Sequence, residues 1–587
     1  MNLTPALAKF FKSTRAQLCV ILLLTFLVYA PSLSNGFVWD DDTFVLGWQQ
    51  THNLPANLVS FLKGAAPSGH EGVYRPLRSI WYSISYLLFG ISPSLYHLQA
   101  IGFHLLATYL VYQIARLIVK HPQVAFWSAL LFGIHPVHIE AVAWATASFD
   151  TIGVTAAIAS FYLYLKYTKT HQLKTYYFSL TTAFLAFFTS EITLSLPFLI
   201  IIYDFLFNSQ TLVKPKLKLF WPYVIMFFTY FLARFTLVGF VNRTPYPYHS
   251  LYLTMLAMAQ AVVLYARLLI APLGLTPNHN IRPGLNAAII HDLNPYNLTH
   301  IPSLFEPSIL FSITIISLTF FIAYYFRRRL PLVTLAITWF YLALLPVSQL
   351  MPQPWIFAER HLYLASLGFC LLVGWTINQI DHLKALKSLP LASIITGITV
   401  ASFWAYLSFS YIPIWHNNLT LWAYAKDSNP ASALIDTNLG EAKYQSGDIK
   451  VAHQLFQQAV DLNPYSTLRQ FNLGLTYLRI EDYDQATNHF IKALEYDPND
   501  FDSRLQLGIT YYQQHNYDQA APEIRQAIKL RPNSDQAYVN LAAVLMAQGQ
   551  LDEATSVLNT ALELNPQNEA ATKNLQIIQQ YQQSSLQ

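Results

Sequence analysis

The stretch PYSTLRQFNLGLTYLRIEDYDQATNHFIKALEYDP, residues 464–498, begins and ends with a proline, and this spacing returns through the last part of the chain. Prolines recur every 34 residues, and glycine or alanine recurs with the same period at fixed positions within each unit. Small residues at fixed points let two antiparallel helices pack closely, so each unit is predicted to be a helical hairpin. The recurring residues are Pro430, Pro464, Pro498, Pro532 and Pro566; Gly440, Gly474, Gly508 and Ala542; Ala452, Ala486, Ala520 and Ala554; and Ala459, Ala493, Ala527 and Ala561.

A 34-residue period of this kind is the signature of tetratricopeptide repeats. We predict an α-solenoid in which Phe456, Phe490, Ile524 and Leu558 fill the space between the two helices of each repeat. A polar capping helix at residues 567–582 is expected to cover the last apolar face. Residues 430–587 carry a net charge of −8 and residues 1–429 one of +12, so the chain is divided at residue 430. The repeats are placed at residues 430–463, 464–497, 498–531 and 532–565.

Residues 1–429 have the composition of a membrane protein. The chain of 587 residues is 54% hydrophobic and only 11% charged, with a mean hydropathy of +0.32. Charged residues make up about a quarter of a soluble domain, so a single soluble domain is excluded. The predicted fold class is all-α, a polytopic membrane helix bundle followed by the solenoid. Apolar stretches of spanning length lie at about 16–33, 96–119, 124–144, 149–165, 175–189, 192–207, 219–240, 254–271, 308–326, 330–346, 361–379 and 390–411.

The basic residues predict how these stretches cross the membrane, because Lys and Arg collect in cytoplasmic loops. The first stretch follows Lys9, Lys12 and Arg15 and has no small-residue cleavage site after it, so we predict a retained signal anchor. Eleven spans keep every basic cluster inside if the segment 254–271 is re-entrant or interfacial. The repeats then lie on the outer side. Twelve crossings would instead place five basic residues outside, namely Arg327, Arg328, Arg329, Lys384 and Lys387.

Acidic residues of the membrane half gather at its predicted outer face. A carboxylate at the centre of a spanning helix costs about 2.5–3.5 kcal/mol on insertion scales, so each acid here needs a reason. The outer loop at residues 34–95 carries Asp40, Asp41 and Asp42, whose mutual repulsion and desolvation raise a pKa and suit a general base or a metal site. The alternative is a solvated charged turn. The outer acids are Asp40, Asp41, Asp42, Glu71, Glu140, Asp150, Glu191, Asp292, Glu306 and Glu359.

Arginines in the same region suit an anionic head group. Arg75 and Arg78 precede a short apolar stretch at residues 80–89, and guanidinium groups bind phosphate through a bidentate fork. The alternative role is interfacial anchoring together with Trp81 and Tyr82. Arg360 follows Glu359, and this pair can also neutralise itself.

Two histidines three residues apart, His135 and His138, share one helix face near Glu140 and Asp150. Two imidazoles with one carboxylate match no metal rule well, so a hydrogen-bonded structural pair is the favoured interpretation over metal ligation. Contact with a phosphate or a sugar hydroxyl is the third alternative. Cys19 and Cys370 both lie in apolar runs and provide neither a disulfide framework nor a Cys-based zinc site.

Four segments together resemble, in order and context, the family of transmembrane and tetratricopeptide-repeat protein O-mannosyltransferases. They are Phe37-Val38-Trp39-Asp40-Asp41, Tyr74-Arg75-Pro76-Leu77, His135 to Val142, and Glu359-Arg360-His361-Leu362-Tyr363. The appended repeats resemble the family as well. Two positions depart from it, because Phe149 precedes Asp150 and Ser190 precedes Glu191 where many relatives have a basic residue.

The resemblance implies a C-type glycosyltransferase that moves a sugar, mannose by family expectation, from a polyprenyl-phosphate donor to Ser or Thr hydroxyls of a protein. One of Asp40 and Asp41 would be the catalytic base of an inverting reaction, and the repeats would present the acceptor. No cofactor is predicted, with a divalent metal as the alternative, and no metal site or nucleic-acid partner is assigned. Donor phosphate and sugar contacts are expected from Arg75, Arg78, His135, His138, Glu140, Asp150, Glu359 and Arg360.

Two other functions stay open from the sequence. The same enzyme class could use a lipid or polysaccharide acceptor, or the chain could be a membrane scaffold that binds proteins through its repeats. We expect a bacterial inner membrane with periplasmic repeats, and an endoplasmic reticulum membrane with luminal repeats as the alternative.

Overall fold

The computed structural model describes residues 5–47, 52–55, 74–207, 213–238, 246, 249–282, 285–286, 301–353, 355–382 and 391–584. The chain forms two compact units, Met1–Asn429 and Pro430–Gln587. Glu71 and Asp292 among the predicted outer acids lie outside the described residues, as do Lys384 and Lys387 among the basic ones.

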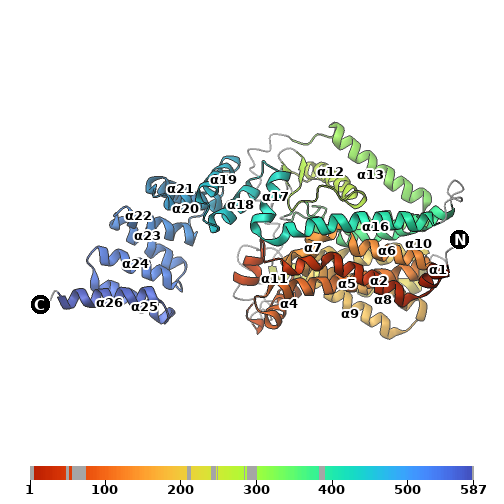
Figure 1. The fold of residues 1–587 in the computed structure, drawn as a ribbon, viewed down its shortest axis with the longest axis horizontal. Coiled ribbons are helices and arrows are strands. Elements are labelled where there is room, and N and C mark those ends of the chain that lie inside the picture. The colour runs from red at the N-terminus through yellow and green to blue at the C-terminus, as the bar shows by residue number, and fades with distance from the viewer. Residues whose placement is uncertain are drawn as a thin grey trace. The chain divides into compact units, whose positions relative to one another are not determined.

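The first unit is helical (Figure 1), with one small antiparallel pair, β1 (Asn280–Arg282) and β2 (Leu285–Asn286). Proline occupies the first turn of several helices, where its missing N–H leaves no hydrogen bond unmade. The α-helices are α1 (Pro5–Lys12), α2 (Thr14–Tyr29), α4 (Pro76–Phe89), α5 (Pro93–Val119), α6 (Pro122–Ile134), α7 (Ile139–Ala143), α8 (Ala145–Thr170), α9 (Leu173–Thr189), α10 (Leu196–Phe207), α11 (Val213–Val238), α12 (Leu251–Ile270), α13 (Pro307–Phe326), α14 (Pro331–Leu344), α15 (Leu362–Gln379), α16 (Ala392–Tyr411) and α17 (Asn418–Ser428). Shorter helical turns are η1 (Ala30–Ser34), η2 (Asp42–Gly47), η3 (Pro136–His138), η4 (Glu191–Ser195), η7 (Leu345–Val347), η8 (Glu359–His361), η9 (Ile380–His382) and η11 (Ile412–His416).

In the described part of the chain, 8 helices are long and apolar enough to cross a membrane. A further candidate is α6 together with η3 and α7, which are bent by 49° at His135. Several predicted stretches are helical but shorter, since α9 has 17 residues and α10 has 12. The multi-pass helical bundle is therefore confirmed, and the number of eleven spans stays a prediction. The spanning candidates are Thr14–Ser34, Pro93–Val119, Ala145–Thr170, Lys218–Leu237, Leu251–Ile270, Pro307–Phe326, Glu359–Gln379 and Ala392–His416.

Helix α12 covers the segment predicted to be re-entrant or interfacial. It is one continuous helix of 20 residues, so its length alone would allow it to cross. Hydrogen bonds join this segment to three other parts of the first unit. Tyr246, just before it, donates to the Leu350 carbonyl in the connection between η7 and η8, and Gln260 donates to Ser308 at the start of α13. Tyr265 contacts His361 at the start of α15. Whether this segment crosses the membrane, re-enters or lies at the interface stays a prediction.

Helix α6 lies at the centre of the first unit and packs against α2, α5 and α15. It is buried on all sides, which fits its uniformly apolar sequence. Two glycines allow close approach to neighbouring helices: a Cβ at Gly133 of α6 would lie 2.2 Å from the Thr25 hydroxyl of α2, and a Cβ at Gly374 of α15 would lie 2.4 Å from the Ser128 hydroxyl of α6. Small residues at such contacts bring helix backbones together inside membranes. Directly after the C-terminal end of this helix, the chain continues with the buried His135 and His138 and then with Glu140, which belongs to the site described below.

The second unit consists of paired helices and a final single one, as the 34-residue period predicts. The small positions hold the pairs together, because Gly440 lies under the Phe456 ring and Gly474 under the Phe490 ring, where a Cβ would come within 2.5 and 2.8 Å. Ala452, Ala486, Ala520 and Ala554 are fully buried. The helices are α18 (Ala433–Gln445), α19 (Ile449–Leu462), α20 (Thr467–Arg479), α21 (Tyr483–Tyr496), α22 (Phe501–Gln513), α23 (Tyr517–Leu530), α24 (Asp535–Ala547), α25 (Leu551–Leu564) and α26 (Glu569–Ser584).

An outside C-terminus is the first testable expectation, because the acids and the repeats must share one compartment for the repeats to serve the site. A reporter that fluoresces only in the cytosol, fused after Gln587, should stay dark. The same reporter fused after His171, in the predicted cytoplasmic connection between α8 and α9, should be bright and serves as the control. A bright signal from the Gln587 fusion would contradict the eleven-span topology.

Candidate functional site

Asp41 ties the turn after η1 to the start of α8. One carboxylate oxygen accepts a hydrogen bond from the Val38 N–H at 3.0 Å. The other accepts from the Thr146 N–H at 2.7 Å and from the Thr146 hydroxyl. The side chain is fully buried, and its oxygens are occupied by these bonds. Burial raises the pKa of Asp41 to about 7, and the bonds from Thr146 oppose this rise.

Asp40 has a different environment from its neighbour. Its side chain is half-buried, and within the described residues no hydrogen bond engages its carboxylate. Burial raises the pKa of Asp40 to about 6, while the positive charges of Arg360 and Arg78 act against this rise. Asp40 is therefore a carboxylate that faces two cations and has acceptor capacity left for another molecule.

Arg78 and Arg75, from the start of α4, are both bound to acids of other elements. Arg78 donates to Asp150 at 3.2 Å, to the Thr146 carbonyl at 3.0 Å and to the Tyr82 hydroxyl at 3.1 Å, which uses all three of its nitrogens. Arg75 binds Glu191 through two nitrogens, at 2.5 and 2.7 Å. These arginines and acids join α4 to α8 and η4.

Arg360 is held by Glu140. One guanidinium nitrogen and the backbone N–H of Arg360 both donate to the Glu140 carboxylate, and the N–H distance is 3.0 Å. The guanidinium lies between the rings of Trp144 and Trp355, 5.4 and 5.5 Å from their centroids. Among the described residues, no hydrogen bond engages its other two nitrogens. Arg360 is thus fixed in place with donors left for an anion.

Glu359 points to a separate set of partners from Arg360. Its carboxylate accepts from the Thr276 N–H at 2.7 Å and lies 2.6 Å from His279. Burial lowers the pKa of His279 to about 4, which favours the neutral imidazole in this contact. Glu359 therefore anchors the segment after α12 and does not neutralise Arg360, which was one sequence interpretation of this pair.

His135 and His138 are used in packing. His135 contacts the Leu269 carbonyl at 3.1 Å and accepts from the Val137 N–H at 3.3 Å. His138 contacts the Ser366 hydroxyl at 2.8 Å, and its ring packs against Tyr363. Both are fully buried. These contacts match the hydrogen-bonded structural pair rather than a phosphate or sugar contact. In the part of the chain that the structure describes, no three side chains of His, Cys, Asp or Glu are grouped to hold a metal ion.

The two positions that depart from the family pattern both pack at the site. Ser190 donates to Asp150 at 2.8 Å, so its hydroxyl takes a place beside Arg78 on the same carboxylate. Phe149 packs on Tyr82 with the ring centroids 4.0 Å apart. A basic residue at position 190 would meet Asp150, which is already paired with Arg78.

Several residues at the site were not singled out by sequence reasoning. Thr146, Trp144, His279, Tyr265 and Asn418 each bond or pack on a predicted site residue or its turn. Of these five residues, only Thr146 and His279 could have been singled out from the sequence, because they are polar residues at the ends of apolar runs. The others are ordinary membrane-interface or loop residues whose partners lie more than 90 positions away in the chain.

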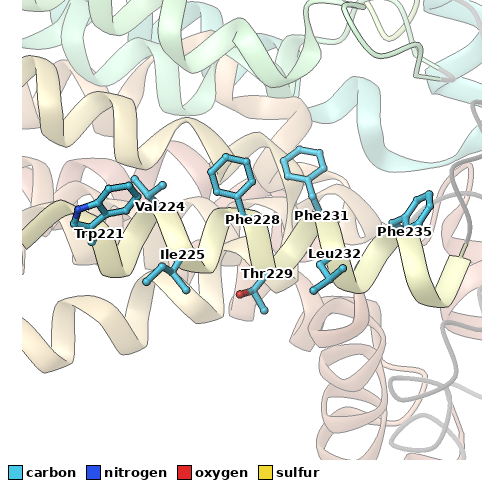
Figure 2. Close-up of a pocket in the computed structure, with 8 residues that line it drawn as sticks. All are labelled: Trp221, Val224, Ile225, Phe228, Thr229, Phe231, Leu232 and Phe235. Carbon is cyan, nitrogen blue, oxygen red and sulfur yellow. The ribbon is translucent and has the colours of Figure 1, made fainter.

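A separate apolar groove of about 520 Å³ lies along α11 (Figure 2). Its side chains are almost entirely hydrocarbon, come from this one helix and are mostly exposed, as expected of a lipid-facing surface, and none of them belongs to the charged site. Its lining residues are Trp221, Val224, Ile225, Phe228, Thr229, Phe231, Leu232 and Phe235.

The fold and the site together define a multi-spanning membrane protein with a tetratricopeptide unit and a cluster of paired charges at one end of its bundle. Tetratricopeptide-repeat family models match residues 477–524 and 505–569. Among solved structures, the chain is similar to the MamA protein, with a TM-score of 0.24 and 20% identity, covering 25% of this chain and 81% of MamA. It is also similar to YrrB, a TPR protein with an unusual peptide-binding site, with a TM-score of 0.25 and 23% identity, covering 28% of this chain and 84% of YrrB.

Curated relatives extend the similarity into the membrane unit. The Caenorhabditis elegans protein O-mannosyl-transferase F38B6.6 is 23% identical over 76% of this chain and 62% of its own length. The Drosophila melanogaster protein O-mannosyl-transferase Tmtc1 is 33% identical over 26% of this chain and 18% of its own length. The human protein O-mannosyl-transferase TMTC1 is 30% identical over 24% and 16%. The chain is similar to these protein O-mannosyl-transferases, and it spans less than two thirds of their length.

The buried Arg360–Glu140 pair gives a stability prediction. Glu140→Gln should cost about 3–5 kcal/mol, because removing one partner leaves a buried guanidinium uncompensated. Thermal unfolding of the detergent-solubilised protein measures this loss. The double variant Glu140→Leu, Arg360→Met removes both charges and should recover most of the lost stability. If the double variant were as unstable as Glu140→Gln, packing and not the charge pair would account for the loss.

Proposed function

We propose that this chain is a membrane glycosyltransferase that moves a sugar, mannose by analogy with the names of its relatives, from a polyprenyl-phosphate donor to Ser or Thr hydroxyls of a protein acceptor. The proposal rests on one observation above the others, the half-buried Asp40 carboxylate without a hydrogen bond beside the cation Arg360. Activation of the acceptor needs a carboxylate that can still accept a proton, and stabilisation of the leaving phosphate needs a cation that can still donate hydrogen bonds.

Asp40 is the base in this proposal. It accepts the proton of the acceptor hydroxyl as the hydroxyl oxygen attacks the anomeric carbon from the face opposite the phosphate. The new C–O bond forms as the bond from the anomeric carbon to the phosphate oxygen breaks, and the configuration is inverted. A carboxyl whose pKa is raised to about 6 is a better proton acceptor than an ordinary aspartate near neutral pH.

Arg360 is the cation that receives the phosphate. The leaving phosphate keeps the electron pair of the broken bond and needs no proton if a cation stabilises its charge. Glu140, Trp144 and Trp355 hold the guanidinium in place before the donor arrives. Arg75 and Arg78 are occupied by Glu191 and Asp150 and act as supports for the site. The polyprenyl chain stays in lipid.

Asp41 then has a positioning role. Its three hydrogen bonds fix the Val38–Asp41 turn against α8 and engage both of its oxygens inside the protein, whereas the Asp40 carboxylate accepts no such bond from the described residues. The sequence could not separate it from Asp40, and the base assignment to Asp40 is part of this proposal. The tetratricopeptide unit would bind the protein acceptor, and the outer compartment is a bacterial periplasm or an endoplasmic reticulum lumen.

Three adjacent carboxylates allow a matched test of the base. Asp40→Asn should lower turnover by about 10²–10⁴-fold, because the amide cannot accept the proton, while donor binding and thermal stability persist. Asp41→Asn should instead lower thermal stability, because its amide nitrogen is a donor and must face either the Val38 N–H or the donors of Thr146. Asp42→Asn, at an exposed position, is the control and should change little.

The measurement is transfer from a labelled polyprenyl-phosphate sugar to cell proteins and, in parallel, to a lipid extract. Normal turnover by Asp40→Asn would rule out Asp40 as the base, and label in the lipid fraction alone would overturn the protein acceptor.

The raised pKa of Asp40 predicts the pH dependence. Only the ionised carboxylate accepts a proton, so kcat/KM should rise with pH and level off above about 6. An ordinary aspartate would give this rise near pH 4. Asp40→Asn should remove the rise and leave a low, flat profile. An inflection near pH 4 in the wild-type protein would contradict the buried environment assigned to Asp40.

A further inference from the structure

Trp39, the residue before Asp40, has a backbone conformation that large side chains rarely adopt. Its φ angle is +56°, in the left-handed region. This region crowds the Cβ of any L-residue and is visited mostly by glycine, asparagine and aspartate. Such a conformation persists only where the surroundings hold it, and the direction of the following side chain depends on it.

The segment around the start of α17 holds this turn. The Trp39 N–H donates to the Asn418 side-chain oxygen at 2.7 Å, and the Gly36 N–H donates to the His416 carbonyl at 2.9 Å. The Trp39 ring stacks on Trp144, with centroids 4.6 Å apart and planes 7° from parallel. Its edge contacts Trp422, also on α17, at 4.8 Å.

The Asn418 side chain does not cap its own helix. That task belongs to Asn417, whose side-chain oxygen accepts from the Thr420 N–H at 2.9 Å. The Asn418 amide reaches away from α17, to the Trp39 N–H and, at 3.5 Å, to the Asp42 carboxylate. Two neighbouring asparagines at one helix start therefore have different partners, one within the helix and one in the turn that carries Asp40.

We propose that Asn418 is a positioning residue for the catalytic turn. Its side-chain oxygen satisfies the Trp39 N–H, keeps Trp39 in the left-handed conformation, and so directs the Asp40 carboxylate to the place where it meets the acceptor hydroxyl. This inference rests on the proposed role of Asp40 as the base. Without the oxygen of Asn418, the Trp39 N–H has no partner and the turn can relax toward extended backbone. A base displaced by about 1 Å loses much of its effect on the rate.

The test compares Asn418→Ala, Asn418→Asp and the control Asn417→Ala in the full chain. Hydrogen exchange of the backbone amides in residues 37–44 reports the turn whether or not the protein has transferase activity. Transfer kinetics with a labelled polyprenyl-phosphate mannose and an unstructured Ser/Thr-containing peptide measure how well Asp40 is positioned to act as the base.

Asn418→Ala should speed exchange at the Trp39 amide by about tenfold or more and lower kcat by about 10- to 100-fold, with KM for the donor little changed. Asn418→Asp keeps the acceptor oxygen, so it should retain slow exchange and most of kcat. Its added negative charge near Asp40 should move the pH inflection upward. Asn417→Ala removes the cap of α17 and should leave the Trp39 amide protected and kcat within about twofold of wild type.

Unchanged exchange at Trp39 in Asn418→Ala would overturn the positioning role. Equal losses of kcat in Asn417→Ala and Asn418→Ala would do the same, because they would show a general effect of α17. If the wild-type protein transfers no sugar while Asn418→Ala alone exposes the Trp39 amide, the contact stands and the proposed function fails.

Discussion

Buried charge pairs at one end of the helix bundle connect elements that are far apart in the chain. Glu140 at the start of α7 holds Arg360 of η8, Asp150 of α8 holds Arg78 of α4, and Glu191 of η4 holds Arg75. A carboxylate or guanidinium removed from water is tolerated only when a counter-ion or hydrogen bonds compensate for the lost solvation. This requirement fixes how α4, α7, α8, η4 and η8 meet.

The site follows from the exception to this pairing. Asp41 is compensated by backbone and hydroxyl donors, whereas Asp40 lies near two cations without a hydrogen bond from either. A carboxylate in this position keeps a raised pKa and open acceptor sites, which are the properties of a proton acceptor. The arginines at the site are not equivalent either, because all three side-chain nitrogens of Arg78 donate to acceptors in the protein, whereas only one of the three does so in Arg360.

Histidines in the bundle show how misleading residue type can be. His135 and His138 stand three positions apart in a sequence that also supplies two nearby acids, and this pattern permits a metal or a phosphate contact. In the folded chain their nitrogens meet a backbone carbonyl, a backbone N–H and a serine hydroxyl. Three of their four ring nitrogens therefore have partners inside the protein, and the two imidazoles contribute to packing between α6, α15 and α16.

The sequence by itself determined the helical class, the multi-pass membrane character and the four repeats, because these depend on local period and composition. The 34-residue spacing of Pro464 and Pro498 and the small residues at Gly440 and Ala452 require only that neighbouring helices pack. The sequence also predicts that the acids gather at one face, since apolar spans leave charged residues few other positions. The tertiary structure alone decided which acid meets which arginine, and it assigned different environments to Asp40 and Asp41. The Glu140–Arg360 pair joins residues 220 positions apart, and the hydrogen bond from Trp39 to Asn418 joins residues 379 positions apart. No local pattern encodes a contact over such separations.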